Sequence, residues 1–294
     1  MDGKLIVSSS PHISSPVKTK NIMLDVIIAL IPSLIASICF FGPRAAVITI
    51  VSVATCVIAE YICRKVMKSE QTIGDLSAVV TGILLAFNLP SSVPIYVPII
   101  GGLVAIVMVK QMFGGLGQNF VNPALLARII LMNSFPVLMT TWYPAGGFGA
   151  DTTATASPLA NIATGSVDAL PSYMDMFIGN IPGCLGETSA LALLIGGIYL
   201  IARKVISPII PVTYIGTVFV LSAILGQDPV AQILCGGLFI GAIFMATDYV
   251  TSPLTNKGKF IYALCCGIIT CLIRVFASLP EGVSYSIIIA NLLV

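Results

Sequence analysis

Residues 21–42 read NIMLDVIIALIPSLIASICFFG, and this stretch decides the class of fold. It is 22 residues long and carries one charge, Asp25. A helix needs about 20 mainly apolar residues to cross a bilayer. Similar stretches follow along the chain. We predict ten membrane-spanning helices, the third and tenth of them short, at 21–42, 44–63, 74–90, 94–110, 121–140, 187–203, 208–226, 229–247, 258–277 and 281–294.

The composition leads to the same class. Of the 294 residues, 57% are hydrophobic and 9% are charged, whereas soluble domains carry about 25% charged residues. The sequence therefore predicts an all-α polytopic membrane protein. The formal charge of +2 gives no indication of nucleic acid binding. The eight cysteines lie mainly in apolar runs without a CxxC spacing, which favours buried small side chains. Metal ligation across separated helices stays open.

The basic residues predict an orientation for these spans. If residues 1–20 are a cytoplasmic N-terminal segment, eleven basic residues fall on the cytoplasmic side, and only Arg44 and Arg274 fall outside. This asymmetry follows the positive-inside rule. It places the long segment 142–186 on the outer face of the membrane. The eleven are Lys4, Lys18, Lys20, Arg64, Lys65, Lys68, Lys110, Arg203, Lys204, Lys257 and Lys259.

Two five-helix halves, 21–141 and 187–294, are predicted on either side of that segment. The sequence GDLSA at 74–78 opens the third span, GETSA at 186–190 opens the sixth, and polar breaks containing proline occur in both halves. Because five is an odd number, two similar halves must have opposite orientations in the membrane. The sequence therefore predicts an inverted repeat, with broken helices and polar backbone where the halves meet.

The segment 142–186 contains DTTATASPLA, at Asp151–Ala160. Four of the six residues 152–157 carry a hydroxyl group, and the whole segment has no Lys, Arg or His. Loops of this length are usually functional or disordered. We therefore expect the hydroxyl cluster to have a function.

A second polar patch lies at 110–124, KQMFGGLGQNFVNPA. Gly114 and Gly115 allow close approach of the backbone, and Gln118, Asn119 and Asn122 supply neutral amide groups that could hydrogen-bond a planar heterocycle. A tight turn before the fifth span, with Asn122 as the N-cap of a helix beginning at a proline, explains the same residues equally well.

Arg128 lies inside the fifth predicted span. Insertion scales assign a guanidinium there a cost of about 2.5–3.5 kcal/mol, so Arg128 needs a partner. Phosphate, carboxylate and backbone carbonyl groups would all serve. A contact with a bound cofactor and a structural ion pair with Asp75, Glu187 or Asp248 are both compatible with the sequence.

Seven segments carry a resemblance to a known family: SPHISSP, GDLSAVVTGILLAFNLP, KQMFGGLGQNFVNPALLAR, DTTATASPLA, GETSALALLIGGIYLIARKVISPIIPV, FMATDYVTSPLTNKGK and LIRVFASLPEGVSY. Over almost its whole length the chain resembles the NqrB/RnfD family. These proteins are membrane subunits of the sodium-pumping NADH:quinone oxidoreductase and of the Rnf ion-translocating electron transport complex. The short N-terminus is more similar to the Rnf branch.

The resemblance implies a ten-helix fold similar to that of urea and ammonium transporters, used here to hold flavins. Family members carry FMN joined through its phosphate to a hydroxyl residue in a motif of the type D-x-x-[S/T]-G-A-T-P-L. Matched on Asp151 and Pro158, this motif places Ser157 at the acceptor position, with Thr153 close to the flavin. Thr155 is the alternative acceptor.

The chain departs from the motif at two positions. Ala154 replaces the usual Ser or Thr, and Thr155 replaces the Gly. Serine offers the same attacking oxygen as threonine, so a phosphoester at Ser157 remains chemically available. Non-covalent FMN is the other outcome. The resemblance also implies a second flavin, riboflavin, which we place near Gly114–Asn122, with Arg128 as a further candidate contact.

The implied function is electron relay between flavins in a translocase that couples ferredoxin and NAD to the movement of Na⁺ or H⁺. The expected partners are a second FMN-bearing subunit, integral membrane subunits, and cytoplasmic subunits with the NAD and ferredoxin sites. This chain has neither a dinucleotide fingerprint nor an iron–sulfur cysteine pattern. The expected location is the inner membrane of a bacterial or archaeal cell. A channel for a small neutral solute is the alternative function.

Overall fold

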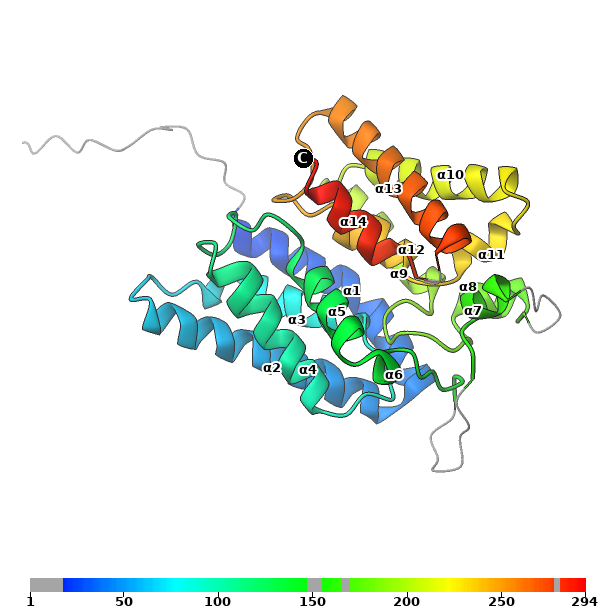
Figure 1. The fold of residues 1–294 in the computed structure, drawn as a ribbon. Helices are drawn as coiled ribbons and strands as arrows, with labels where there is room; N and C mark the ends of the chain where they lie inside the picture. The colour runs from blue at the N-terminus through cyan, green and yellow to red at the C-terminus, as the bar shows by residue number, and fades with distance from the viewer. Residues whose placement is uncertain (1–17, 147–154, 165–169, 278–280) are drawn as a thin grey trace, which may run out of the picture.

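The computed structural model describes residues 18–146, 155–164, 170–277 and 281–294. Over these ranges the regular structure is helical, and β-structure is limited to two isolated bridges, Pro90 with Cys184 and Trp142 with Thr155. Figure 1 shows the helices of the first half of the chain at the lower left and those of the second half at the upper right. The all-α prediction is confirmed for the part of the chain described.

The first half contains α1 (Thr19–Phe41), α2 (Pro43–Val66), the 3-10 turn η1 (Ile73–Asp75), α3 (Ser77–Phe87), α4 (Tyr96–Leu103), the π-helical η2 (Val104–Gln111), α5 (Pro123–Ser134) and α6 (Pro136–Met139). Gly42, at φ 72°, ends α1, and Pro43 occupies the first turn of α2. A positive φ is accessible to glycine at little cost, and proline is well suited to the first helical turn. These two residues make the sharp reversal between the two longest helices.

The second half follows two short helices, α7 (Pro158–Ala163) and α8 (Tyr173–Ile178). It contains α9 (Ala190–Ala202), α10 (Ile209–Ile224), α11 (Pro229–Leu234), α12 (Leu238–Ile240), the π-helical η4 (Gly241–Met245), α13 (Asn256–Phe276) and α14 (Val283–Asn291). The eighth predicted span, 229–247, is interrupted, because Cys235 is extended and Gly236 has a φ of 72°.

The helix lengths and the exposed faces are those of a membrane protein. Helices α1, α2 and α13 are long and apolar enough to cross a bilayer, and five shorter apolar segments accompany them. Side chains such as Ile35, Ile50 and Ile198 are more than half exposed, which suits contact with lipid. Each of the ten predicted spans coincides with helical structure, although the third extends only from Ser77 to Phe87.

The two halves meet along two helix pairs, α1 against α9 and α5 against α14. Between these pairs, the end of α3 runs beside the segment that leads into α9. Gly186 N donates to Phe87 O at 3.0 Å, and Leu185 N donates to Leu89 O at 3.0 Å. The backbone groups left open where α3 ends are therefore satisfied inside the protein, as they must be at membrane depth.

Tyr214 ties the second half together and supports a first prediction. Its hydroxyl lies 2.7 Å from Thr270 Oγ1 and 2.8 Å from Ser286 Oγ, joining α10, α13 and α14. We expect Tyr214→Phe to lower the unfolding free energy by about 1–3 kcal/mol, because buried hydroxyl groups lose their partner. Thermal unfolding in detergent measures this change. Tyr96→Phe, at a residue 48% exposed, is the control, and equal midpoints for the two variants would contradict the prediction.

Candidate functional site

Ser157 lies at the start of α7, where its side chain caps the helix. Ser157 Oγ accepts a hydrogen bond from Ala160 N at 3.3 Å, and the residue is 7% exposed. Pro158 follows in the first turn and is buried. A serine N-cap before a proline is a favoured way to begin a helix. The local sequence therefore holds the Ser157 hydroxyl in a fixed place.

The neighbouring hydroxyl residues are placed differently. Thr155 is exposed, and its backbone N donates to Trp142 O at 2.9 Å. This bridge fixes the main chain two residues before Ser157. Asp151 and Thr153, the other predicted members of the site, lie outside the described residues.

Ser157 lines a cleft between α5, α6 and α7, which we call the Ser157 cleft. It holds about 1190 Å³ of space, counting the part open to solvent. Its walls carry two aromatic side chains, Trp142 and Tyr285, and the thioether of Met132. The remaining lining residues are Asn133, Pro136, Thr140, Ala156, Ala160 and Glu281. Flat apolar walls with a few polar groups are typical of sites for organic cofactors.

A smaller hollow on the other side of Ser157 carries acidic side chains. Glu187 and Glu281 line it together with Ser157 and Thr188. The residues that line the hollow and the Ser157 cleft include no Lys or Arg. A free phosphate beside Ser157 would therefore have no cationic side chain among these lining residues to bind it.

Arg128 is the centre of a buried polar cluster just below this hollow. Arg128 Nη1 donates to Asn88 Oδ1 at 2.7 Å and to Ser284 Oγ at 3.2 Å. Its Nη2 is hydrogen-bonded to Glu281 Oε2 and lies 3.9 Å from Glu187 Oε2. Arg128 is 2% exposed. We call these five residues, with Cys184, the Arg128 cluster.

The cluster settles which acids partner Arg128. Of the three predicted, Glu187 forms an ion pair with it, whereas Asp75 accepts hydrogen bonds from Ser77 and Asp248 accepts one from Thr251. Glu281 was missed, because it precedes the helical part of the tenth predicted span and nothing in the sequence connects it to α5. The structural ion pair, one of the two readings left open, is therefore present.

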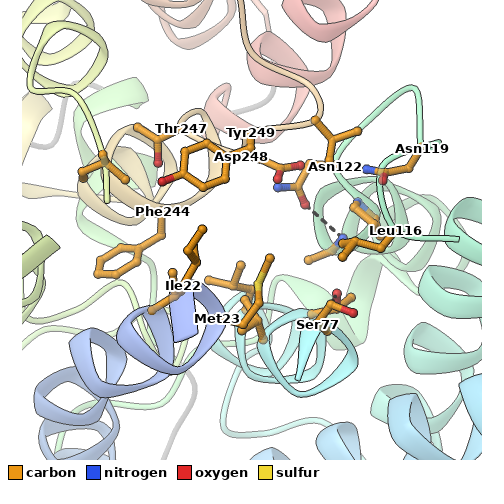
Figure 2. A pocket seen from close by; sticks show the side chains of 18 of the residues that line it. Ile22, Met23, Ser77, Leu116, Asn119, Asn122, Phe244, Thr247, Asp248 and Tyr249 are labelled. Carbon is orange, nitrogen blue, oxygen red and sulfur yellow. Dashed lines mark hydrogen bonds between the residues drawn. The ribbon is translucent and has the colours of Figure 1, made fainter. Parts of the chain in front are cut away.

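The predicted amide patch lines a second cavity, which we call the interhalf pocket. It lies between α1, α3 and η2 of the first half and α9 and η4 of the second (Figure 2). The space is about 800 Å³, counting its open mouth. Its walls are largely apolar, and its polar lining residues are Ser77, Thr81, Lys110, Asn119, Asn122, Thr247, Asp248 and Tyr249.

Only part of the predicted patch reaches this pocket. Asn119 and Asn122 line it, whereas Gln118 and Gly114 are exposed and Arg128 is not among the lining residues. Gly115 is buried at φ 100°, and a Cβ there would lie 2.0 Å from Arg64 Nη2. The glycines therefore serve a tight turn beside α2.

Asn122 has a structural role that the sequence predicted. Its Oδ1 accepts from Ala124 N at 3.1 Å and Leu125 N at 3.3 Å, which makes it the N-cap of α5. Its Nδ2 donates to Met245 O at 3.4 Å, which ties α5 to η4 in the other half. Both polar atoms of Asn122 are thus already engaged. Asn119 donates to Val121 O at 3.1 Å, and its carbonyl oxygen is the freer amide group.

A buried ion pair beside the pocket was missed. Lys110 Nζ donates to Glu60 Oε2 at 3.0 Å and to Ser77 Oγ at 2.5 Å. Lys110 is 2% exposed and Glu60 is fully buried. Sequence reasoning placed Lys110 on the cytoplasmic side and gave Glu60 no role. A basic residue at the end of an apolar run gives no signal of whether it faces water or the protein interior.

Comparison with known proteins gives a consistent result over the whole chain. A model of the NQR2, RnfD, RnfE family matches residues 6–294. The RnfD subunit of the Na⁺-translocating ferredoxin:NAD⁺ oxidoreductase complex of Acetobacterium woodii is 48% identical over 291 residues, which cover 98% of this chain and 90% of that protein.

Two further relatives are similar over comparable lengths. The corresponding subunit of the proton-translocating ferredoxin:NAD⁺ oxidoreductase complex of Clostridium ljungdahlii is 42% identical, covering 97% of this chain and 91% of that protein. The corresponding subunit of the ion-translocating oxidoreductase complex of Escherichia coli O7:K1 is 32% identical, covering 98% and 94%.

Proposed function

The chain belongs to the NQR2, RnfD, RnfE family, and from this we propose that it is the RnfD subunit of a membrane-bound ferredoxin:NAD⁺ oxidoreductase complex that translocates Na⁺ or H⁺. The observation that carries this proposal is 48% identity to such a subunit over 98% of the chain. Its partners are then the other subunits of the complex, including a second FMN-bearing subunit and the cytoplasmic subunits that bind NAD and ferredoxin.

Within that complex, we propose that this chain holds FMN at Ser157 through a phosphoester. Three observations support Ser157 over Thr155: it fits the acceptor position of the motif, it is nearly buried, and it lines a cleft with Trp142 and Tyr285. The acidic side chains nearby, Glu187 and Glu281, also support a covalent bond, because charge attraction would not retain the phosphate there.

The residues of the Ser157 cleft fit an isoalloxazine ring. Trp142, Tyr285 and Met132 give the flat apolar surface that such a ring needs, and aromatic side chains prefer offset or edge-on packing against other rings. When bound, FMN supplies one- or two-electron chemistry. The protein's part is to hold the ring, limit its contact with water and set its electrostatic surroundings.

We propose that the interhalf pocket holds the second flavin, riboflavin. The apolar side chains of Met23, Leu84 and Phe244 would cover the ring, and the amide of Asn119 and the hydroxyl of Thr247 would reach its polar edge (Figure 2). The exposed Gln118 and Gly114 and the buried Arg128 contribute less than the sequence suggested.

The architecture that we propose is an inverted repeat of two five-helix halves, similar to that of urea and ammonium transporters. The packing supports it: α2 contacts α3 and α4 in the first half, as α10 contacts α11 and α13 in the second. The halves meet at equivalent helices, α1 with α9 and α5 with α14. In the proposed orientation residues 1–20 are cytoplasmic, and segment 142–186 lies outside the inner membrane of the cell.

The experiment that tests the FMN site measures flavin fluorescence of the denatured subunit in a gel. We expect a fluorescent band in the wild type, no band for Ser157→Ala, and an unchanged band for Thr155→Ala. Mass spectrometry of the peptide across 146–171 should show the added FMN on Ser157. A band that survives in Ser157→Ala and disappears in Thr155→Ala would place the ester on Thr155. A native complex purified without any flavin would favour the solute channel.

A further inference from the structure

The wall of the interhalf pocket contains a buried ion pair for which the proposed flavin sites give no role. Lys110, on η2, pairs with Glu60, on α2, and both are nearly or wholly inaccessible to solvent. Removing two charges from water is costly, and a well-packed apolar pair is often at least as stable. The pair is therefore weak evidence for a purely structural role.

The surrounding groups hold both charges firmly in place. Glu60 Oε1 accepts from Thr72 Oγ1 at 2.7 Å and from Gln111 Nε2 at 3.1 Å. Glu60 Oε2 accepts from Lys110 Nζ. The carboxylate thus has three donors, and Asp75 holds the hydroxyl of Ser77 at 2.5 Å. A network satisfied to this degree fixes the position of the Lys110 ammonium group.

The π-helical segment explains how two neighbouring side chains reach the same carboxylate. In a regular α-helix, adjacent residues point about 100° apart. Lys110 and Gln111 are adjacent, yet both bond to Glu60 from the end of η2. Short π-helical stretches are frequent at functional sites. Here the stretch brings Lys110 to the pocket wall while its partner stays behind it.

Lys110 keeps one donor for a ligand. An ammonium group has three N–H donors, and Lys110 uses two among the described residues, to Glu60 and Ser77. Both Lys110 and Ser77 line the interhalf pocket, whereas Glu60 does not. A ligand in the pocket would therefore lie nearer to the positive member of the pair than to the negative one. Asp248, on the opposite segment after η4, is the acid that lines the pocket.

We propose that Lys110 contacts the flavin in the interhalf pocket and raises its reduction potential, and that Glu60 acts as a positioning residue that moderates this effect. The inference rests on the proposed second flavin. Each electron that the flavin takes up adds negative charge, which the nearby ammonium stabilises. The reduced ferredoxin of the complex supplies the electron, so that the protein residues themselves are neither oxidised nor reduced.

The test compares reduction potentials in a complex that carries Ser157→Ala, so that FMN on Ser157 does not contribute. In that background we expect Lys110→Met to lower the potential of one non-covalent flavin. The expected change is at least tenfold in the equilibrium constant of a one-electron step, which is about 59 mV. Glu60→Gln should raise the same potential, because the Lys110 charge is then unbalanced. Lys110→Arg should keep it close to that of the background.

Two controls separate a charge effect from general damage. Lys65→Met removes an exposed cation at the end of α2 and should leave the potential unchanged. Flavin released on denaturation should be measured for every variant, to show that the pocket is still occupied. A shift in the same direction for Lys110→Met and Glu60→Gln, or an unshifted Lys110→Met complex, would overturn the inference.

The same measurement distinguishes failure of the inference from failure of the proposed function. A complex that releases flavin but shows no shift contradicts the role of Lys110 alone. A Ser157→Ala complex whose non-covalent flavin is fully accounted for by other subunits contradicts both the second flavin here and this inference. If Lys110→Met prevents assembly, the upward shift of Glu60→Gln carries the test, and its absence counts against the proposal.

Discussion

Arg128→Leu should leave little folded protein, because it removes the cation of the Arg128 cluster and leaves two buried carboxylates without a counter-charge. Arg128, Glu187 and Glu281 are each less than a tenth exposed. Breaking a buried ion pair from one side costs about 3–5 kcal/mol. Against a typical total stability of about 5–15 kcal/mol, this is a large share. The midpoint of thermal unfolding in detergent and the amount of subunit in membranes measure the effect.

Arg44→Leu is the matched control for this prediction. Arg44 is exposed and donates to Ser92 O at 3.0 Å and Val93 O at 3.2 Å. Its loss should change the unfolding free energy by about 0.5–1.5 kcal/mol, the usual net contribution of a hydrogen bond. Equal midpoints for the two variants would show that the Arg128 cluster does not carry the stability assigned to it.

A triple variant separates charge from shape. Arg128→Leu combined with Glu187→Gln and Glu281→Gln removes all three charges and should recover more than half of the lost stability, since neutral replacements of buried ion networks are often tolerated. A triple variant no more stable than Arg128→Leu alone would mean that the guanidinium matters mainly through its hydrogen bonds to Asn88 and Ser284.

The sequence was sufficient for those features that depend on local composition. The apolar run at 21–42 predicted α1, the Asn122–Pro123 pair predicted the start of α5, and a polar break was predicted at 245–259, just after η4. Each of these follows from residues close together in the chain. An N-cap, a proline in the first turn and a continuous apolar face act on their own neighbours.

The partners across the fold were out of reach for the same reason. Arg128 lies 153 residues from Glu281 in the chain, and Lys110 lies 50 residues from Glu60. Nothing at either position shows which of several acids will be its neighbour. Contacts of this kind are set by how α2, α5 and the segments before α9 and α14 pack.

The placement of charge has a common logic in the two halves. Lys110 and Arg128 both lie where a regular helix is interrupted nearby, at η2 and beside the end of α3. Arg274, on α13, likewise donates to the carbonyl groups of Gln232 and Cys235 at the break after α11. Interrupted helices leave polar backbone groups inside a membrane protein. Buried cations can satisfy such groups, and at the same sites they can set the potential of a bound cofactor.

The packing of the two halves leads to the second large prediction, Gly196→Ala. Gly196 lies on α9 where it crosses α1, and a Cβ there would lie 2.1 Å from Ala29 O. That atom belongs to the backbone of α1 and can move only if the helix moves. Overpacking of a core costs about 1–3 kcal/mol, occasionally more. Because α1 with α9 is one of the two contacts between the halves, we expect a cost at the upper end of this range and a lower thermal unfolding midpoint.

Gly216→Ala is the matched control, because it adds the same methyl group on α10 with nothing within 4 Å of the new Cβ. Alanine is favoured over glycine inside a helix by about 1 kcal/mol, so this variant should be as stable as the wild type or slightly more stable. If Gly196→Ala separates the halves as expected, the interhalf pocket opens and its releasable flavin is lost, while FMN on Ser157 is retained. Loss of both flavins together would mean that the two halves do not move as separate units.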